Sequence, residues 1–245
     1  MKILFAAPEN AWGGFLNLIR SAVPEHEFKA TGGLHIETLE GYDVLIPTMA
    51  TVTQETLKSC DRLKLIQQCG SGLELVDIDA AVAQGIRVAN VPTDISGNAD
   101  SVAEVGIYMM IGLSRDVYTM ARSLADRQMG FPQGRALFGR TVGLVGLGGI
   151  AQALIRRLKT FDVKLMGIKR HSPREAGRQL GLEWAGTPDE LDVLLQQSDF
   201  VVLCLPVTAE SKGIMTRHAF QQMKNDAFLI NLSRGGLVDR QDLED

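Results

Sequence analysis

A glycine-rich segment carries the most specific chemical pattern in the sequence. The pattern is G-x-G-x-x-A, and its residues are Gly146, Gly148, Gly149, Ile150 and Ala151. It follows an apolar run and opens an amphipathic stretch, as expected of a turn from a β-strand into an α-helix. Such a turn lets a pyrophosphate approach the backbone at the second glycine, and the helix amino terminus offers unpaired N–H groups to the phosphates. A plain turn between a strand and a helix is the alternative interpretation.

Two basic residues follow the next expected strand, at positions 163–168. Sites that prefer NAD usually place Asp or Glu at this point, where it accepts a hydrogen bond from the ribose 2′-hydroxyl. This sequence has Lys169 and Arg170 instead, and both would attract a ribose 2′-phosphate. We therefore expect NADP(H) to be favoured as the cofactor, with NAD(H) possible. The alternative is that both are solvated surface charges.

The elements that must position these residues follow one plan along the chain. Short aliphatic runs alternate with helical patterns, which indicates βαβ units and a mainly parallel sheet. The expected strands are 2–6, 42–46, 64–68, 86–90, 141–147, 163–168, 200–205 and 227–231. The expected helices are 53–59, 79–84, 149–160 and 217–224, with one more starting at Thr187 and another capped by Asp239.

A longer helix is expected from Asn98 to beyond Leu113. Apolar residues wrap most of the way round it, so we expect an almost wholly buried helix packed between two domains. We place the domain change just before it. The predicted fold class is α/β, with two Rossmann-like or flavodoxin-like parallel-sheet domains: a substrate domain over 1–93 and the dinucleotide-binding domain over 94–245.

Composition narrows the class of protein. The chain has 245 residues, of which 45% are apolar and 22% charged, as in globular proteins. Its formal net charge of −4 gives no reason to expect nucleic acid or an anionic membrane as a partner. The amino terminus reads as a strand rather than a signal peptide, and the three cysteines lack metal-ligand spacing. We expect a cytoplasmic protein without a metal site.

Three ordered blocks of sequence resemble one known family. The first block runs from Cys69 to Glu104, the second is the glycine-rich segment, and the third runs from Ser198 to Asp239 with the core Asn-Leu-Ser-Arg-Gly-Gly. Together they resemble the D-isomer-specific 2-hydroxyacid dehydrogenases, and the likeness covers nearly the whole chain. The resemblance implies hydride transfer between NAD(P)H and a D-2-hydroxy acid/2-oxo acid pair, of the glyoxylate or hydroxypyruvate type.

The resemblance also implies roles for individual residues. Ser71 and Gly72 match the loop whose backbone N–H groups hold the substrate carboxylate. Arg234 matches the catalytic arginine, which binds that carboxylate and the reacting oxygen. Positions that line the cofactor are matched by Ser101, Leu205, Pro206 and Ser233.

The family's catalytic glutamate and histidine lie downstream of the arginine, and only eleven residues follow Arg234 here. The chain is therefore expected to be truncated, with neither those two residues nor the carboxy-terminal segment that returns to the first domain. That leaves the activity of this piece by itself in question.

Two further hypotheses remain open: a dinucleotide-binding regulatory protein similar to corepressors, and an inactive fragment. Retention of Ser71, Gly72 and Arg234, which serve a substrate carboxylate, favours an enzyme acting on a small 2-oxo or 2-hydroxy carboxylate. Family members commonly pair through the cofactor domain, so we also expect a homodimer.

Overall fold

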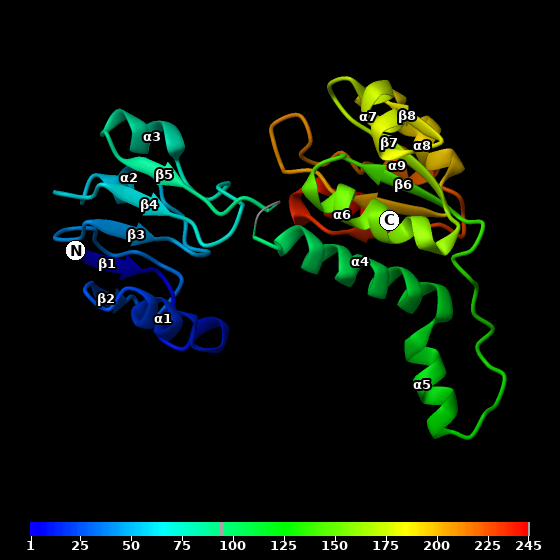
Figure 1. The fold of residues 1–245 in the computed structure, drawn as a ribbon, viewed down its shortest axis with the longest axis horizontal. Helices are drawn as coiled ribbons and strands as arrows, with labels where there is room; N and C mark the ends of the chain where they lie inside the picture. The colour runs from blue at the N-terminus through cyan, green and yellow to red at the C-terminus, as the bar shows by residue number, and fades with distance from the viewer. Residues whose placement is uncertain (94–95, 245) are drawn as a thin grey trace. The chain divides into compact units, whose positions relative to one another are not determined.

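The computed structural model describes residues 1–93 and 96–244, and the chain forms two compact units, Met1–Thr93 and Asp94–Asp245. Each unit contains a sheet of five parallel strands flanked by helices (Figure 1). This architecture confirms the predicted α/β class with two parallel-sheet domains. The expected point of domain change touches residues 94–95, which lie outside the described residues.

The first unit has the strand order β2-β1-β3-β4-β5, which is the flavodoxin-like order. Its strands are β1 (Lys2–Phe5), β2 (Glu27–Ala30), β3 (Val44–Ile46), β4 (Leu65–Gln67) and β5 (Arg87–Ala89), and its helices are α1 (Ala11–Ala22), α2 (Gln54–Leu57) and α3 (Ile78–Ala83). The four strands predicted here are present. β2 and α1 were not predicted, because β2 is a short edge strand with charged residues and α1 opens at two glycines with non-helical backbone angles.

The second unit has the strand order β10-β9-β6-β7-β8. Its strands are β6 (Thr141–Val145), β7 (Lys164–Ile168), β8 (Trp184–Gly186), β9 (Phe200–Leu203) and β10 (Phe228–Asn231). Its helices are α4 (Asn98–Arg115), α5 (Val117–Ala125), α6 (Gly149–Leu158), α7 (Pro173–Leu180), α8 (Leu191–Gln197), α9 (Arg217–Gln222) and α10 (Arg240–Glu244), with short 3-10 turns at Lys159–Phe161, Pro188–Glu190 and Gly235–Leu237. The order reverses between β6 and β9, as in dinucleotide-binding Rossmann sheets.

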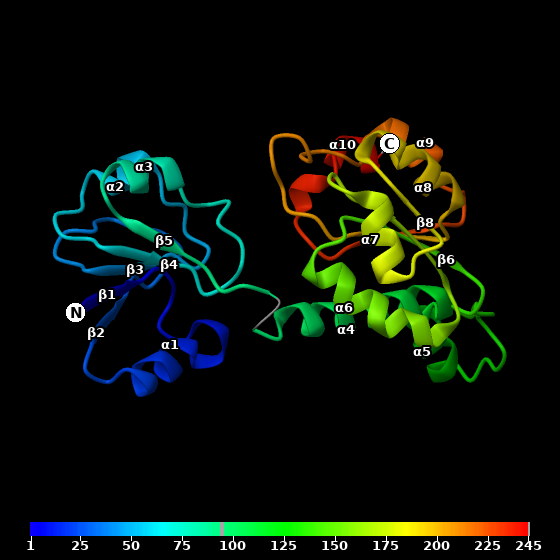
Figure 2. The ribbon, with the colours of Figure 1, turned by 45° about the horizontal axis from the view of Figure 1, so that its top comes forward.

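Alternating side chains of the second sheet build a core on both faces. Val202 packs in the cluster formed with α4 and α6, while its neighbours Val201 and Leu203 pack in the cluster formed with α8 and α9. The two pairs of helices lie on opposite sides of the sheet in Figure 2. Two predicted helix starts are also confirmed: Thr187 and Glu190 form a capping box, and the carboxylate of Asp239 accepts from the backbone of α10.

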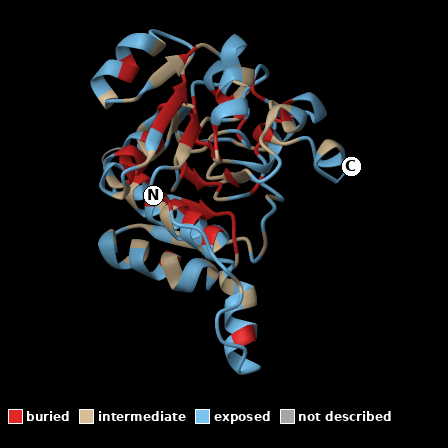
Figure 3. Cartoon of the chain, turned by 90° about the vertical axis from the view of Figure 1, so that its right-hand side faces the viewer, coloured by how far each residue is buried: buried red, intermediate tan, exposed pale blue. Residues whose placement is uncertain are grey.

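The prediction that the helix from Asn98 is almost wholly buried is wrong. The buried residues of α4 recur every three or four positions and face the sheet and α6; they are Ala99, Ala103, Gly106, Met110 and Ser114. Its other side is apolar but exposed, through Val105, Tyr108, Met109, Ile111 and Leu113. α5 and the segment after it extend away from the sheet (Figure 1), and α5 is exposed over most of its length (bottom of Figure 3). The apolar residues all round α4 therefore belong to two faces, one that packs against the rest of the second unit and one that is exposed.

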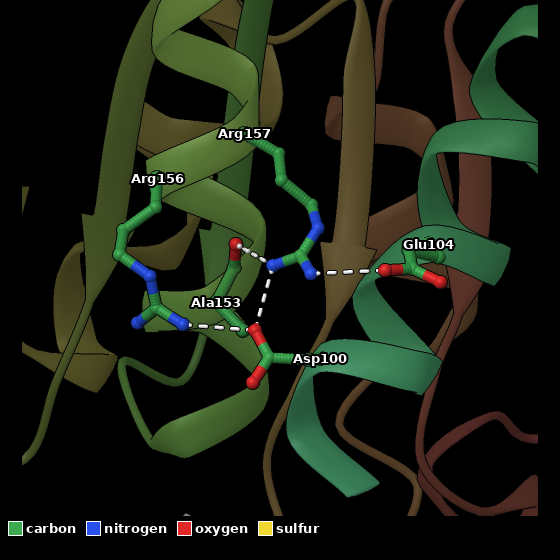
Figure 4. A network of polar contacts seen from close by, with 5 residues as sticks. All are labelled: Asp100, Glu104, Ala153, Arg156 and Arg157. Atoms are coloured by element: carbon green, nitrogen blue, oxygen red, sulfur yellow. Dashed lines mark hydrogen bonds and ion pairs between the residues drawn. The ribbon is translucent and has the colours of Figure 1, made fainter. Parts of the chain in front are cut away.

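Charged side chains fasten the amino-terminal end of α4 to α6. Arg157 donates to Asp100 Oδ1 at 2.8 Å, to Glu104 Oε1 at 3.0 Å and to the carbonyl oxygen of Ala153 at 3.1 Å, and Arg156 adds a second bond to Asp100 (Figure 4). The hydrogen bond from Arg157 is the main reason that the pKa of Asp100 lies below its usual value. The network joins the first two turns of α4 to the last turn of α6 within the second unit.

Candidate functional site

The glycine-rich segment forms the turn from β6 into α6. Gly146 has a φ of +96°, a left-handed conformation that residues with a side chain rarely adopt. A Cβ atom at this position would lie 2.9 Å from Leu205 Cβ and 3.0 Å from the carbonyl oxygen of Cys204. The backbone of β6 therefore passes so close to the end of β9 that only glycine fits there.

The next glycines leave the amino terminus of α6 open. Gly148 is the N-cap residue in an extended conformation, and a Cβ atom added to it would meet nothing within 4 Å. Gly149 and Ile150 are half-buried in the first turn, while Ala151 is fully buried and packs in the core beneath it. An open backbone above a closely packed helix start can accept an anion at the positive end of the helix dipole.

A cleft of about 560 Å³ lies at the carboxyl ends of β6, β7 and β9. Five of the predicted cofactor-binding residues line it: Gly146, Lys169, Arg170, Leu205 and Pro206. These residues come from three loops that are distant in sequence and meet because parallel strands share one carboxyl edge. The cleft sits where the strand order reverses, which is the usual ligand position in open α/β sheets.

Six predicted cofactor-binding residues are not among those that line this cleft: four at the start of α6 (Gly148, Gly149, Ile150 and Ala151), and Ser101 and Ser233. Ser101 is exposed on the first turn of α4. Ser233 follows β10, where its backbone N–H donates to the side chain of Asn231 at 2.9 Å. Their roles remain predictions.

An acidic residue at the cleft was not predicted. Glu210 lies in the segment after β9, and its carboxylate is 3.5 Å from Arg170 Nη2 and accepts a hydrogen bond from the Thr208 hydroxyl at 2.7 Å. That hydrogen bond, with the nearby charge of Arg170, holds the pKa of Glu210 below its usual value. The sequence signal was weak, because the two partners are 40 positions apart in an irregular segment.

The predicted substrate-binding residues belong to different units. Ser71 and Gly72 lie in the loop after β4, where the Asn90 side chain donates to the carbonyl oxygen of Ser71 at 2.7 Å. Arg234 lies after β10, exposed, and its own carbonyl oxygen accepts from the Asn231 side chain at 2.8 Å. An asparagine side chain thus holds the backbone at each place: Asn90, just after β5, at Ser71, and Asn231, at the end of β10, at Arg234. The substrate role of all three residues remains a prediction.

Three further observations concern metal ligands, membrane-spanning helices and a cysteine in the described ranges 1–93 and 96–244. These ranges contain no cluster of three or more His, Cys, Asp or Glu side chains that could hold a metal ion. They also contain no helix of the length and apolarity needed to span a membrane. Cys204, next to the glycine turn, is buried, and burial raises the pKa of its thiol to about 12, so it stays protonated and unreactive.

The two glycines of the turn provide a matched test of this geometry. We expect Gly146→Ala to destabilise the second unit by about 1 to 3 kcal/mol, through backbone strain and overlap with β9. Gly148→Ala has space and a compatible backbone, so it should change stability by less than about 0.5 kcal/mol. Urea unfolding followed by Trp184 fluorescence in a Trp12→Phe background reports on the second unit. Equal stabilities of the two variants would contradict the assigned packing.

Comparisons with known proteins identify the family. Residues 107–245, more than half of the chain, match the model of the D-isomer specific 2-hydroxyacid dehydrogenase, NAD binding domain. The D-3-phosphoglycerate dehydrogenase of Methanocaldococcus jannaschii is 32% identical over 213 residues, covering 85% of this chain and 39% of that enzyme. The hydroxypyruvate reductase of Thermotoga maritima is 31% identical over 204 residues, covering 82% of this chain and 63% of that enzyme. The chain thus spans well under half of the first relative and less than two-thirds of the second.

Solved structures agree with this assignment. The NAD-dependent formate dehydrogenase from Staphylococcus aureus, in complex with NAD, superimposes with a TM-score of 0.84 at 25% sequence identity, covering 99% of this chain and 76% of that one. The family resemblance expected from the three sequence blocks is therefore confirmed. The chain belongs to the D-isomer specific 2-hydroxyacid dehydrogenase family, and its second unit contains the NAD binding domain of that family.

Proposed function

We propose that the protein is an NAD(P)-dependent oxidoreductase that transfers a hydride between the nicotinamide and a D-2-hydroxy acid/2-oxo acid pair. The observation that carries this proposal is the cleft at the carboxyl ends of β6, β7 and β9, bordered by the glycine turn. The names of the relatives, a phosphoglycerate dehydrogenase and a hydroxypyruvate reductase, support the substrate class of small 2-hydroxy and 2-oxo acids.

The chain's own residues fit a bound dinucleotide. The turn at Gly146 and Gly148 leaves the backbone N–H groups at the start of α6 accessible to a pyrophosphate. Lys169 and Arg170 follow β7, the position where this fold contacts the ribose of the adenosine half. Leu205 and Pro206 supply apolar surface after β9. The nicotinamide, when bound, donates or accepts the hydride, and the protein positions it.

The substrate is held, in this proposal, through its carboxylate. The backbone N–H groups of Ser71 and Gly72 would bind the anion at little steric cost. Arg234 has a planar fork of donors, which can bind a carboxylate and stabilise charge that develops on the reacting oxygen. We assign the accompanying proton to none of the four histidines: His218, for example, is engaged by Asp192 at 2.9 Å.

We also propose that NADP(H) is favoured over NAD(H). Lys169 and Arg170, the first two residues after β7, both line the cleft and are both cations. A ribose 2′-phosphate is a dianion with three acceptor oxygens, so it gains more from these cations than a hydroxyl does. We further propose a cytoplasmic location, because the three cysteines are free and free thiols are typical of a reducing compartment.

The expected homodimer has a candidate contact surface. The uncovered face of α4 continues onto α5 and the segment up to Phe138, where Tyr118 is 83% exposed, Leu124 58% and Phe138 72%. Apolar side chains concentrated on one projecting segment are typical of a surface that another molecule covers. We propose a second copy of the chain as that molecule, because a self-complementary surface would cover this segment in both copies.

Nucleotide binding tests the function and the cofactor preference together. We expect the 245-residue chain to bind NADPH more tightly than NADH in calorimetric titrations. Lys169→Asp/Arg170→Ala should weaken NADPH binding by at least about tenfold, because charge-assisted bonds to phosphate are lost. Lys164→Asp/Arg178→Ala is the control, since it makes the same charge change at the opposite end of β7 and on α7. Tighter binding of NADH would contradict the preference, and a folded chain that binds neither would contradict the function.

The dimer contact is tested by charge insertion. We expect wild-type protein to sediment as a dimer and Tyr118→Glu/Leu124→Glu to sediment as a monomer with unchanged circular dichroism. Leu18→Glu is the control, because Leu18 is 69% exposed on α1 of the first unit and lies outside the proposed contact. A monomeric wild-type protein, or a double variant that remains dimeric, would contradict this assignment.

A further inference from the structure

An ion pair links two segments of chain that border the cofactor cleft. Arg170 comes from the end of β7, and Glu210 comes from the segment after β9, on the other side of β6 in the sheet. Arg170 Nη2 lies 3.5 Å from Glu210 Oε2, and both side chains are more than half exposed, at 57% and 67%. The predicted phosphate-binding arginine thus already has an anionic partner that belongs to the protein.

The segment that carries Glu210 is held in a fixed conformation. Ser211 is buried, and its hydroxyl donates to the carbonyl oxygen of Pro206 at 2.7 Å while accepting from the backbone of Thr208 at 2.8 Å. The Thr208 hydroxyl donates to Glu210 at 2.7 Å. Because the turn is closed by these bonds, the carboxylate is presented toward Arg170 by the backbone and not only by its own rotamer.

We propose that Glu210 sets the balance between the two nucleotides by competing with a ribose 2′-phosphate for Arg170. This inference rests on the proposed function, since it concerns the same cleft. A 2′-phosphate bound by Arg170 would be repelled by the negative charge of the Glu210 carboxylate. It would have to share the guanidinium with that carboxylate or displace the carboxylate from it. A 2′-hydroxyl carries no charge and meets no such opposition. Lys169 also lines the cleft, so a cation is still available to NADP(H).

The site should therefore accept both nucleotides and should prefer NADP(H) less strongly than it would without Glu210. Lys169 and Arg170 favour the phosphate, and Glu210 reduces that advantage. Removal of the carboxylate charge should therefore act on NADP(H) alone. A general loosening of the cleft would instead change the binding of both nucleotides.

The direct test is Glu210→Gln, with NADPH and NADH titrated calorimetrically against wild type and variant. Glutamine keeps the size of the side chain and can still accept from Thr208. We expect NADPH to bind about three- to tenfold more tightly to the variant and NADH to change by less than about twofold. The gain should shrink at about 0.5 M salt, where exposed charges are screened.

Two further variants separate competition from other effects. In an Arg170→Ala background, Glu210→Gln should raise NADPH affinity by a clearly smaller factor, because the contested guanidinium is absent and only direct repulsion between the carboxylate and the phosphate is removed. An equal gain in both backgrounds would contradict competition for Arg170. Glu175→Gln is the matched control: Glu175 is an exposed carboxylate on α7 that accepts a hydrogen bond from Gln179, and its loss should leave both affinities unchanged.

The outcomes distinguish this inference from the proposed function. If the chain binds NADPH but Glu210→Gln leaves that affinity unchanged or weakens it, the inference is overturned and the proposed function stands. If Glu175→Gln raises NADPH affinity as much as Glu210→Gln does, the gain is a general charge effect and the inference is again overturned. If the folded wild-type chain binds neither nucleotide, both are overturned.

Discussion

The close approach of β6 to the end of β9 constrains the rest of the second unit. At Gly146 the space for a side chain is taken by Leu205 and by the Cys204 backbone, so the chain must turn sharply with a left-handed glycine and enter α6 at once. That turn points the amino terminus of α6 at the carboxyl edge of the sheet. The loops after β6, β7 and β9 therefore border one cleft, which is where we propose that the dinucleotide binds.

Charge then divides the cleft into regions. The start of α6 provides a positive dipole end without a charged side chain, which suits a pyrophosphate of fixed position. Lys169 and Arg170 provide two cations after β7, and Glu210, in the segment after β9, forms an ion pair with Arg170. In the proposed function, binding of the pyrophosphate and discrimination at the ribose therefore depend on different elements, so that the two properties could vary separately.

Much of this could be predicted from the sequence because it is local. The glycine turn, the cations after β7 and the capping box at Thr187 each occupy a few consecutive residues, and their geometry follows from chain stereochemistry. Glu210 could not be predicted, since its partner is brought to it only by the order of strands in the sheet. The exposed side of α4 was misjudged for a related reason: an apolar residue contacts either this chain or another molecule, and periodicity does not distinguish the two.

Hydrogen exchange of the chain with and without NADPH tests most directly the claim that the cleft beside the glycine turn binds the cofactor. The account predicts slower exchange on NADPH addition in peptides that cover residues 146–151, 168–171 and 205–211, with little change in α9 and α10. Protection absent from these three segments, or spread equally over the second unit, would contradict the placement of the cofactor at the carboxyl edge of β6.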